Sequence, residues 1–365
     1  MNTYVRLPLR LKSSKRLYYN KIILSKYQKE IINFLEGEDY FNSLGFAKKA
    51  LLLEEIKANN SIEGINDDLL MIENVIKNKK NIPRKQKERI INLYKGYNYI
   101  LKNKVINKDN LKILYDILSK GLLDDYSAQN MGDYYRTKPV YILNSRKLDI
   151  YTYKGIKEDR LEYYMNKLFD YINEENTNNE FIKSQIIHFY FVYVHPYFDV
   201  NGRTARTVSM WHLLNKKCYP YIIFNRAISF NKTKYEKKII NARSNGDITL
   251  FLKYMLKEVK KELEKELLIQ NISDNLDGNL SREEAQILEY ALSIKGDITL
   301  KSLNTKYNAY NVFKKEDDFI DQDIKPLINK KIIYLDSNRQ LKLSADLISS
   351  KSKIKRLKSS KFIKN

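Results

Sequence analysis

The chain has 365 residues, 43% of them hydrophobic, with 66 basic and 44 acidic side chains and a formal net charge of +22. It is long and apolar enough for two or three globular domains with their own cores. A single cysteine, Cys218, excludes an internal disulfide framework, and with three histidines it is a poor basis for a zinc site. With no apolar run long enough to span a bilayer and no signal-peptide segment, we expect a cytoplasmic chain without membrane contact.

Most of the positive charge is spread evenly along the chain, which is typical of a solvated lysine-rich surface rather than of a nucleic-acid site. The exception is Lys351–Lys364, which contains basic residues and no acids. We therefore expect a disordered basic tail over residues 349–365 that contacts anionic polymers without sequence preference.

The N-terminal region, residues 1–104, has a helical pattern from Ser13 onward, interrupted by glycine and proline. Within it, apolar residues recur at helical spacing over about residues 46–64, and Gly64 is a suitable helix end. Glu63 lies in the last turn, where its carboxylate faces the negative end of the helix dipole. A cation from elsewhere in the fold is needed to compensate it.

A β-hairpin is predicted after a helix over Lys108–Leu123. Two short apolar runs, Val140–Leu143 and Leu148–Tyr151, flank a polar turn, and the hairpin covers about residues 134–152. Its exposed edge would offer backbone groups to which a peptide can add as a further strand. The alternative is a hairpin with no functional role, and the sequence does not separate the two.

The segment Phe181–Val194 is apolar and aromatic, and its periodicity fits a buried helix or a buried strand equally well. It leads into a polar loop, His195–Arg206, and a further helix that we expect to begin near Thr204. The loop is the most informative stretch of the chain because it combines an imidazole, a carboxylate, an amide, a glycine and two guanidinium groups.

These side chains point to a site that handles a polyphosphate. Asp199 is placed to hold Mg²⁺, while the free amides and the dipole of a helix N-terminus favour an anion. Arg203 and Arg206 lie three residues apart on one helix face, so both can reach successive phosphates. His195 is the side chain of the loop whose ordinary pKa suits a general base near neutral pH.

The loop resembles the signature of the Fic family, His-Pro-Phe-x-Asp/Glu-Gly-Asn-Gly-Arg-x-x-Arg, whose best-known members transfer AMP from ATP to a hydroxyl of a target protein. Two positions differ, since Tyr197 stands in place of Phe and Val200 in place of the first Gly. Val200 is the more serious change, because a β-branched residue resists positive φ and adds bulk where a phosphate would approach.

The resemblance implies a mainly α fold with a Fic-type core over residues 105–270, in which Phe181–Val194 is the central helix. It implies that His195 is the catalytic base, that Asp199 holds Mg²⁺ and that ATP is the substrate. The nucleotide-binding residues would then be Val200, Asn201, Gly202, Arg203, Arg206 and Tyr235.

The segment that ends at Glu63 resembles the inhibitory helix of the family, Ser/Thr-x-x-x-Glu-Gly/Asn, with Asn59 in the place of the hydroxyl residue. In the family this glutamate pairs with the second arginine of the signature, here Arg206, and keeps ATP from a productive position. The hairpin resembles the family's flap, which holds the target segment. Its docking residues would be Tyr135, Arg136, Val140 and Ile142.

Beyond the core, the pattern predicts helices over Asn231–Ala242 and Thr249–Leu268 and a polar linker over Asn271–Asn279. Residues 280–348 then predict three helices, the first with a capping box, followed by a small hairpin. This is the order of a winged helix, a domain that often follows Fic cores. It would contact DNA through the third helix, Asp321–Lys330, or dock a protein, and both options stay open.

We therefore expect a protein adenylyltransferase that moves AMP from ATP to a Tyr, Thr or Ser hydroxyl of a target protein or of itself, silenced by the Glu63–Arg206 pair. Within the family, removal of AMP and transfer of another nucleotide or of phosphocholine are alternatives, whereas Gly202 argues against the phosphate-transferring branch, which carries Lys there. A DNA-binding regulator with a degenerate Fic core is an alternative of a different class. A homodimer is also left open.

Overall fold

The computed structural model describes residues 3–27, 47–79, 81–144, 147–175, 179–216, 224–276, 280–294, 297–309, 311 and 313–344. The chain divides into two compact units. One comprises residues 1–63 and 69–260, and the other residues 64–68 and 261–365. Cys218 and the predicted basic tail, residues 349–365, lie outside the described residues.

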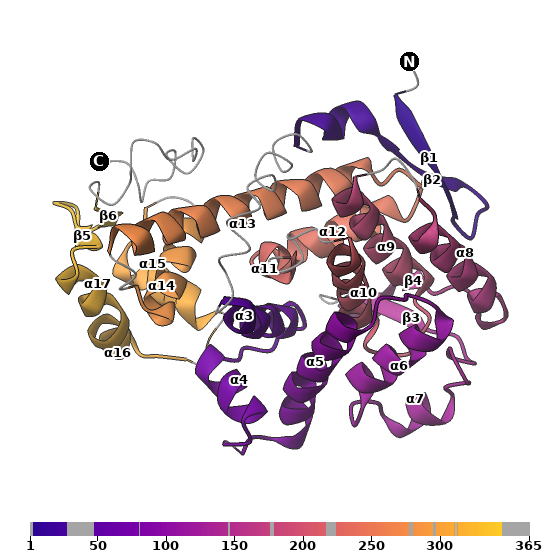
Figure 1. Ribbon diagram of the computed structural model, residues 1–365, viewed down its shortest axis with the longest axis horizontal. Coiled ribbons are helices and arrows are strands. Elements are labelled where there is room, and N and C mark those ends of the chain that lie inside the picture. The colour runs from indigo at the N-terminus through magenta and orange to yellow at the C-terminus, as the bar shows by residue number, and fades with distance from the viewer. Residues whose placement is uncertain are drawn as a thin grey trace. The chain divides into compact units, whose positions relative to one another are not determined.

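The first unit is mainly helical, with two small antiparallel strand pairs (Figure 1). Its elements, in chain order, are β1 (Tyr4–Arg10), β2 (Arg16–Asn20), α3 (Ala47–Ile62), α4 (Leu69–Ile76), α5 (Arg84–Lys102), α6 (Lys108–Ser119), α7 (Asp125–Gln129), β3 (Tyr141–Asn144), β4 (Lys147–Lys154), α8 (Leu161–Asn173), α9 (Glu180–Val194), α10 (Asn201–Asn215), α11 (Phe224–Ser229) and α12 (Lys232–Ala242). Helix α13 (Thr249–Asn275) contains residues of both units.

Helix α9 is the centre of this unit, and it packs against α8 and α10. Its N-terminus is capped by Asn179, whose side chain accepts hydrogen bonds from the amides of Phe181 and Ile182. All but two of its fifteen side chains are buried. A helix that is surrounded by protein needs no polar face, which is why its periodicity did not distinguish it from a strand.

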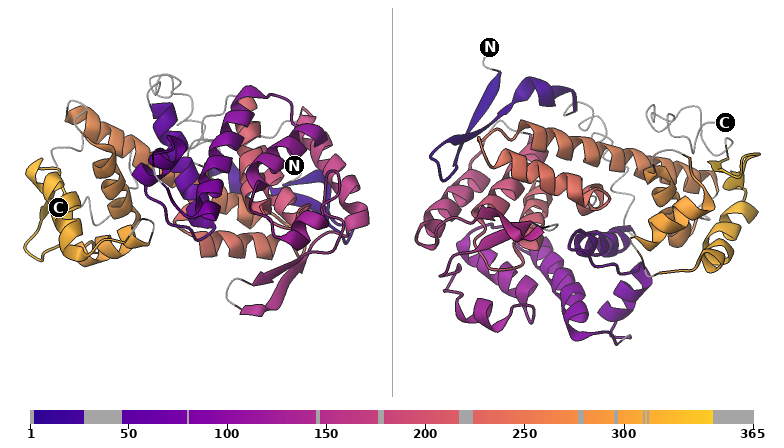
Figure 2. Two further views of the ribbon diagram at one scale, coloured as in Figure 1. Left: turned by 90° about the horizontal axis from the view of Figure 1, so that it is seen from below. Right: turned by 180° about the vertical axis from the view of Figure 1, so that it is seen from behind.

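The N-terminal strand pair corrects the expectation of helix from Ser13 onward. Strands β1 and β2 pair antiparallel, with Tyr4 opposite Asn20. In β2, Leu17 and Tyr19 are buried while their neighbours are more exposed, which is the alternation of a strand with one face on a core. In Figure 2, the right-hand view shows this pair at the N-terminal end of the chain, and the left-hand view shows the β3–β4 hairpin extending from the helices.

Two helix ends also differ from the expectation. Helix α10 begins at Asn201 rather than near Thr204, because Val200 takes the N-cap position. Helix α13 continues to Asn275, through the first half of the expected linker. Leu268 and Ile272, which are one turn apart and both buried, continue its apolar stripe.

Beyond α13, the described part of the second unit contains three helical segments followed by a hairpin, in the expected order. Ser281 and Glu284 form the expected capping box, with the Ser281 hydroxyl accepting from the Glu284 amide and the Glu284 carboxylate accepting from the Ser281 amide. That a winged-helix domain is formed stays a prediction. The elements are α14 (Arg282–Ser293), α15 (Leu300–Asn308), α16 (Glu316–Phe319), a π-helical turn (Ile320–Ile324), α17 (Lys325–Asn329), β5 (Ile333–Leu335) and β6 (Leu341–Leu343).

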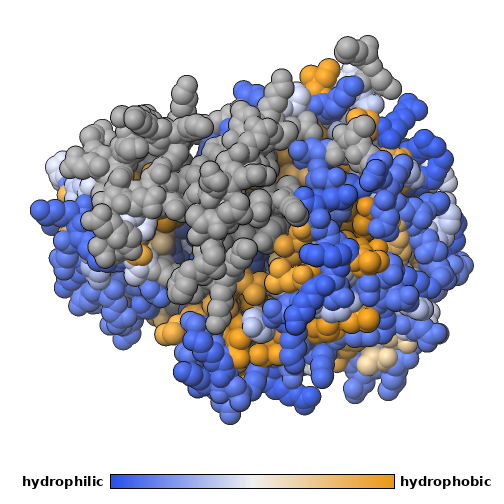
Figure 3. Space-filling model, viewed as in Figure 1, coloured by the Kyte–Doolittle hydropathy of each residue, from blue (hydrophilic) through white to orange (hydrophobic). Residues whose placement is uncertain are grey.

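The face shown in Figure 3 is largely hydrophilic where its residues are described, with apolar residues gathered near its middle. None of the helices in the described part of the chain combines the length and the hydropathy that a membrane crossing requires.

Candidate active site

The C-terminal end of α9 presents His195 in a fixed backbone position. His195 is the C-cap residue with φ 54° and ψ 62°, a left-handed conformation, and its amide donates to the carbonyl of Phe191. The segments that carry the β3–β4 hairpin are tied to this corner. The amide of Arg136 donates to Pro196 O at 3.1 Å, and the amide of Ile156 donates to Val194 O at 3.4 Å. Both ends of the hairpin therefore start beside His195.

The surroundings of the His195 imidazole favour its neutral form. Burial lowers its pKa from 6.5 to about 3, and the positive charges of Arg243 and Arg136 act in the same direction. Nδ1 lies 3.4 Å from the carbonyl oxygen of Val192, an arrangement that favours the proton on Nδ1. Nε2 is then the proton acceptor that a general base needs.

Asn201 and Tyr197 give the loop its shape. The Asn201 Oδ1 accepts from the amide of Tyr197 at 3.0 Å, and Asn201 Nδ2 donates to the Tyr197 carbonyl at 2.8 Å. The Tyr197 ring is buried and stacks on Tyr115 at a centroid distance of 3.5 Å. Both polar atoms of the Asn201 side chain thus bind the backbone of Tyr197. Contact of Asn201 with a nucleotide stays a prediction.

Val200 adopts the left-handed conformation that its β-branched side chain disfavours. Its φ is 65° and its ψ is 5°, and the side chain is buried. Its carbonyl accepts from both the amide and the hydroxyl of Thr204, which fixes the first turn of α10. The position needs the glycine-like backbone of the family signature, and valine meets that need under strain.

Asp199 is the exposed carboxylate of the loop, with 63% of its side chain accessible. Its Oδ1 accepts from the amide of Val200, and Oδ2 lies 4.0 Å from Arg203 Nη2. Within the described ranges, no three His, Cys, Asp or Glu side chains cluster to hold a metal. One exposed carboxylate fits Mg²⁺ that shares its other ligands with water and phosphates, as this ion commonly does.

Arg206 is the most heavily engaged side chain of the site, and it is fully buried. Its Nη2 donates to Glu63 Oε1 at 2.5 Å and to Asn59 Oδ1 at 2.7 Å, and its Nε donates to Asn59 Oδ1 at 3.1 Å. Asn59 Nδ2 in turn donates to the hydroxyl of Tyr97. Arg206 is thus the cation that the position of Glu63 at the end of α3 required.

The pKa of Glu63 reflects this contact. Burial raises the pKa of the carboxyl, but the charge and hydrogen bond of Arg206 outweigh it, with Arg203 adding to the effect, so the pKa lies below its ordinary value. Glu63 is therefore ionised at neutral pH. Gly202 lies against the pair, since a Cβ at that position would be 3.1 Å from both Glu63 Oε1 and Arg206 Nη1. A larger residue there would press on the ion pair.

Tyr235 is buried, and its hydroxyl lies 2.8 Å from Nε2 of His188 with the two rings parallel. Burial lowers the pKa of His188 to about 3, so this histidine is neutral. Burial raises the pKa of the Tyr235 hydroxyl, and the nearby charge of Arg206 opposes this rise. Tyr235 therefore lies beside the site, and its contact with the nucleotide base stays a prediction.

Arg136 does not lie on an exposed flap, which corrects that expectation. Its side chain is buried, and it donates to the carbonyls of His195, Lys138 and Ile156. It fastens the base of the hairpin to the His195 corner and is not available to a docked peptide. Sequence reasoning could not see this, because an arginine in a polar stretch is usually exposed.

The other predicted flap residues lie on or beside the β3–β4 hairpin. Tyr135 is partly buried, and the Val140 carbonyl accepts from the amide of Gly155 at the open end of the hairpin. Ile142 pairs with Tyr153 in the strand ladder, which shifts register beyond this pair, and its side chain lies outside the described residues. Their contact with a target stays a prediction.

Sequence reasoning missed the site roles of Tyr97 and Arg243. Tyr97 holds Asn59, and Arg243 lowers the pKa of His195. Neither residue belongs to a recognisable motif. The sequence does contain a weak signal for the contacts of Asn59 and Glu63 with Arg206. Glu55, Asn59 and Glu63 recur every four residues and so form a polar stripe along one face of the segment.

Residues 105–213 match the family described as the Fic/DOC family. The chain contains a Fic domain. Fic proteins are in general transferases, and AMP transferases are among them. The matched segment includes His195–Arg206, α9 and the β3–β4 hairpin, whereas Glu63 precedes it.

Solved structures of Fic proteins share the fold. A Fic family protein from Desulfovibrio desulfuricans is 18% identical, with a TM-score of 0.57 over 89% of this chain and 95% of its own. Fic-1 from C. elegans is 19% identical, with a TM-score of 0.53 over 69% of this chain and 75% of its own. At such identities the likeness extends to the fold alone. No curated protein matches the sequence.

Proposed function

We propose that the chain is a protein adenylyltransferase that is held in a low-activity state by Glu63. The observation that carries the proposal is the 2.5 Å contact between Glu63 Oε1 and Arg206 Nη2, made beside Gly202 at the start of α10. A carboxylate there occupies the guanidinium that would otherwise bind a phosphate. Contact with an ionised glutamate is therefore the inhibited state of a site suited to a nucleoside triphosphate.

In the proposed reaction, the oxygen of a target Tyr, Thr or Ser hydroxyl attacks the α-phosphorus of ATP. The bond from that phosphorus to the bridging oxygen of the β-phosphate breaks, and pyrophosphate leaves with the electron pair. His195 Nε2 accepts the hydroxyl proton, which its neutral state allows. The products are an AMP ester of the target and pyrophosphate.

The remaining residues bind and orient the nucleotide. Arg203 and Arg206 would hold the outer phosphates, and the amides at the N-terminus of α10 would face the α-phosphate where charge develops. Asp199 would hold Mg²⁺, which supplies charge neutralisation between neighbouring phosphates when it is bound.

The experiment is labelling with α-³²P-ATP and Mg²⁺ of the wild type, Glu63→Gly and Glu63→Gly/His195→Ala. We expect self-labelling by Glu63→Gly to exceed that of the wild type by at least about tenfold, since a partly buried hydrogen bond between charged groups is worth roughly 1.5–3 kcal/mol. The double variant should return to background. Label from γ-³²P-ATP should not be retained, because AMP and not phosphate is transferred.

A matched control is Glu73→Gly, which removes a carboxylate from α4 that pairs with Lys77. It should label no more than the wild type. If Glu63→Gly labels no more than the double variant with ATP, the proposal fails. Parallel reactions with GTP, UTP and CTP identify the nucleotide that Val200 admits.

A further inference from the structure

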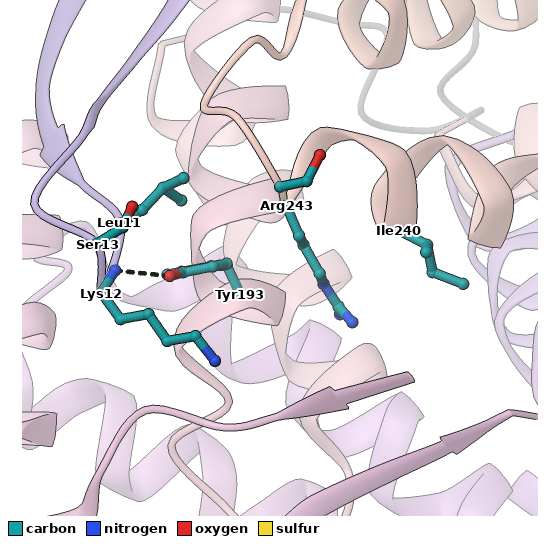
Figure 4. Close-up of a pocket in the computed structure, with 7 residues that line it drawn as sticks. Leu11, Lys12, Ser13, Tyr193, Ile240 and Arg243 are labelled. Atoms are coloured by element: carbon teal, nitrogen blue, oxygen red, sulfur yellow. Dashed lines mark hydrogen bonds between the residues drawn. The ribbon is translucent and has the colours of Figure 1, made fainter. Parts of the chain in front are cut away.

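A cavity of about 300 Å³ lies beside the catalytic corner (Figure 4). Its walls come from the turn between β1 and β2, from the last turn of α9 and from the end of α12. The lining residues are Leu11, Lys12, Ser13, Tyr193, Ile240, Arg243 and Ser244. The β1–β2 pair, which the sequence did not predict, therefore takes part in a concave site.

The turn that forms one wall is held in place by α8 and α9. The amide of Lys12 donates to the hydroxyl of Tyr193 at 2.7 Å, and the carbonyl of Leu11 accepts from the hydroxyl of Tyr164 at 3.4 Å. Figure 4 shows the Tyr193 side chain reaching from α9 toward Lys12, with Arg243 on the other side of it. Lys12 thus has a defined backbone position at the edge of the cavity.

The chemistry of the cavity favours an anion with a short apolar stem. Lys12 and Arg243 supply two positive charges, and Ser13 and Ser244 supply hydroxyls. The described residues that line it include no aspartate or glutamate. Leu11 and Ile240 add apolar surface. A carboxylate or phosphate on a side chain matches both parts of this lining.

The cavity is close to the place where a hydroxyl must be presented. Tyr193 is two residues from His195, and the charge of Arg243 acts on the His195 imidazole. The hairpin also begins here, because the amide of Ile156 bonds to Val194 O. Two residues of chain separate Cα atoms by at most about 7.6 Å, and an extended peptide advances about 3.3 Å per residue.

We propose that this cavity binds an acidic side chain of the target protein, a carboxylate or a phosphorylated residue within about three positions of the modified hydroxyl. The proposal rests on the adenylyltransferase function and deepens it by naming a determinant of the target sequence. Lys12 attracts the acid and the β1–β2 turn places it, while the hairpin holds the adjoining segment.

The test uses the full-length Glu63→Gly chain, labelled ATP and peptides with one Tyr among alanines. Each of the three positions on either side of Tyr is occupied in turn by Glu, phosphoserine, Ala or Lys. We expect Glu or phosphoserine at one of these positions to raise kcat/KM roughly fivefold over Ala, the upper range for a partly exposed ion pair. The preference should shrink as salt is added. The ratio of Glu to phosphoserine distinguishes the two sources of negative charge.

Lys12→Glu should abolish or invert this preference and leave KM for ATP unchanged. Lys15→Glu is the matched control, because Lys15 belongs to the same turn, is exposed and does not line the cavity. An equal preference in the Lys12→Glu and Lys15→Glu variants would overturn the proposal. So would a raised KM for ATP with an unchanged peptide preference, since the cavity would then serve the nucleotide.

A second arm separates this proposal from the proposed function. Binding of fluorescein-labelled versions of the same peptides is followed by anisotropy without nucleotide. If no nucleotide supports transfer, the adenylyltransferase function fails. Peptide binding that depends on the acid and on Lys12 then still supports the cavity as an acidic-residue site, and equal binding of all peptides overturns it.

Discussion

At the scale of single residues, the loop between α9 and α10 begins and ends with a residue in a left-handed backbone conformation. His195 has φ 54° and Val200 has φ 65°. For a residue with a Cβ this conformation costs roughly 1–2 kcal/mol. The surrounding contacts impose it, since the amide of His195 completes α9 and the carbonyl of Val200 begins α10. Strain is thus concentrated at the two ends of the loop between α9 and α10.

Val200 provides a test of that strain. We expect Val200→Gly to be more stable than Val200→Ala, although it removes more of the side chain. Both variants lose the two buried methyl groups, worth about 1.5–2 kcal/mol, but glycine alone also relieves the left-handed strain of about 1 kcal/mol. The free energy of unfolding in urea measures both. An alanine variant that is the more stable of the two would show that Val200 is unstrained.

His195 provides a prediction about pH. Its pKa is lowered to about 3 in the folded chain, so it stays unprotonated as the pH falls through 6.5. The transfer rate of Glu63→Gly should therefore change less than about twofold between pH 7.5 and 5.5, whereas a base with a pKa of 6.5 would lose about tenfold. A steep loss centred near pH 6.5 would show that His195 is not held neutral.

The same shift has a consequence for stability. The unfolded chain binds a proton at this histidine near pH 6.5, and the folded chain does so only near pH 3. This histidine therefore lowers the free energy of unfolding as the pH falls below 6.5, and its effect is complete below about pH 3. His188, whose pKa is also lowered to about 3, acts in the same direction.

At the scale of elements, α3 is attached to the Fic domain at two levels. Glu55 is buried and accepts from the backbone amide and side chain of Asn225 on α11, and Glu54 pairs with Arg226. Burial raises the pKa of Glu55 to about 8, with the Asn225 bonds opposing it. One and two turns further along, Asn59 and Glu63 hold Arg206 on α10. Glu63, which directly follows α3, is therefore held in place by a helix that is anchored independently of it.

Asn59 should keep Arg206 in position when Glu63 is removed. In the Glu63→Gly background, we expect Asn59→Ala to raise KM for ATP at least about fivefold and to lower the free energy of unfolding by about 1–3 kcal/mol. The reason is that the buried guanidinium loses its acceptor and the Tyr97 hydroxyl loses its donor.

The matched control is Tyr97→Phe, which removes only the outer hydroxyl and should have the smaller effect on KM. Initial rates against ATP concentration and urea unfolding measure the two quantities. If both variants lose stability but keep KM, Asn59 has a structural role only and does not position Arg206.

At the scale of the whole molecule, the excess of positive charge does not extend to the helical segment from α16 to α17. The segment of α16, the π-helical turn and α17 carries five acids, Glu316, Asp317, Asp318, Asp321 and Asp323. Lysines in or beside this segment pair with acids, as Lys314 does with Asp323 and Lys325 with Asp321. Such a segment is poorly suited to contact phosphates. DNA contact and protein docking by the second unit both stay predictions.

The sequence by itself predicted the chemistry of the loop His195–Arg206, because the signature residues are contiguous and their types are those of phosphate handling. It also determined the capping box and most helix positions, since these depend on neighbours three or four residues apart. It pointed to a pairing of Glu63 with a cation, because a carboxylate at a helix C-terminus is unfavourable unless it is compensated.

Only the tertiary structure decided what depends on residues far apart in the chain. Arg136 is buried because three carbonyls around the His195 corner satisfy it, and no local pattern encodes that arrangement. The β1–β2 turn meets α9 and α12 across more than 180 residues, so the cavity of Lys12 and Arg243 has no sequence signature. Val200 is left-handed because α10 must begin there, although its own preference is the opposite. Long-range packing outweighs local propensity at each of these places.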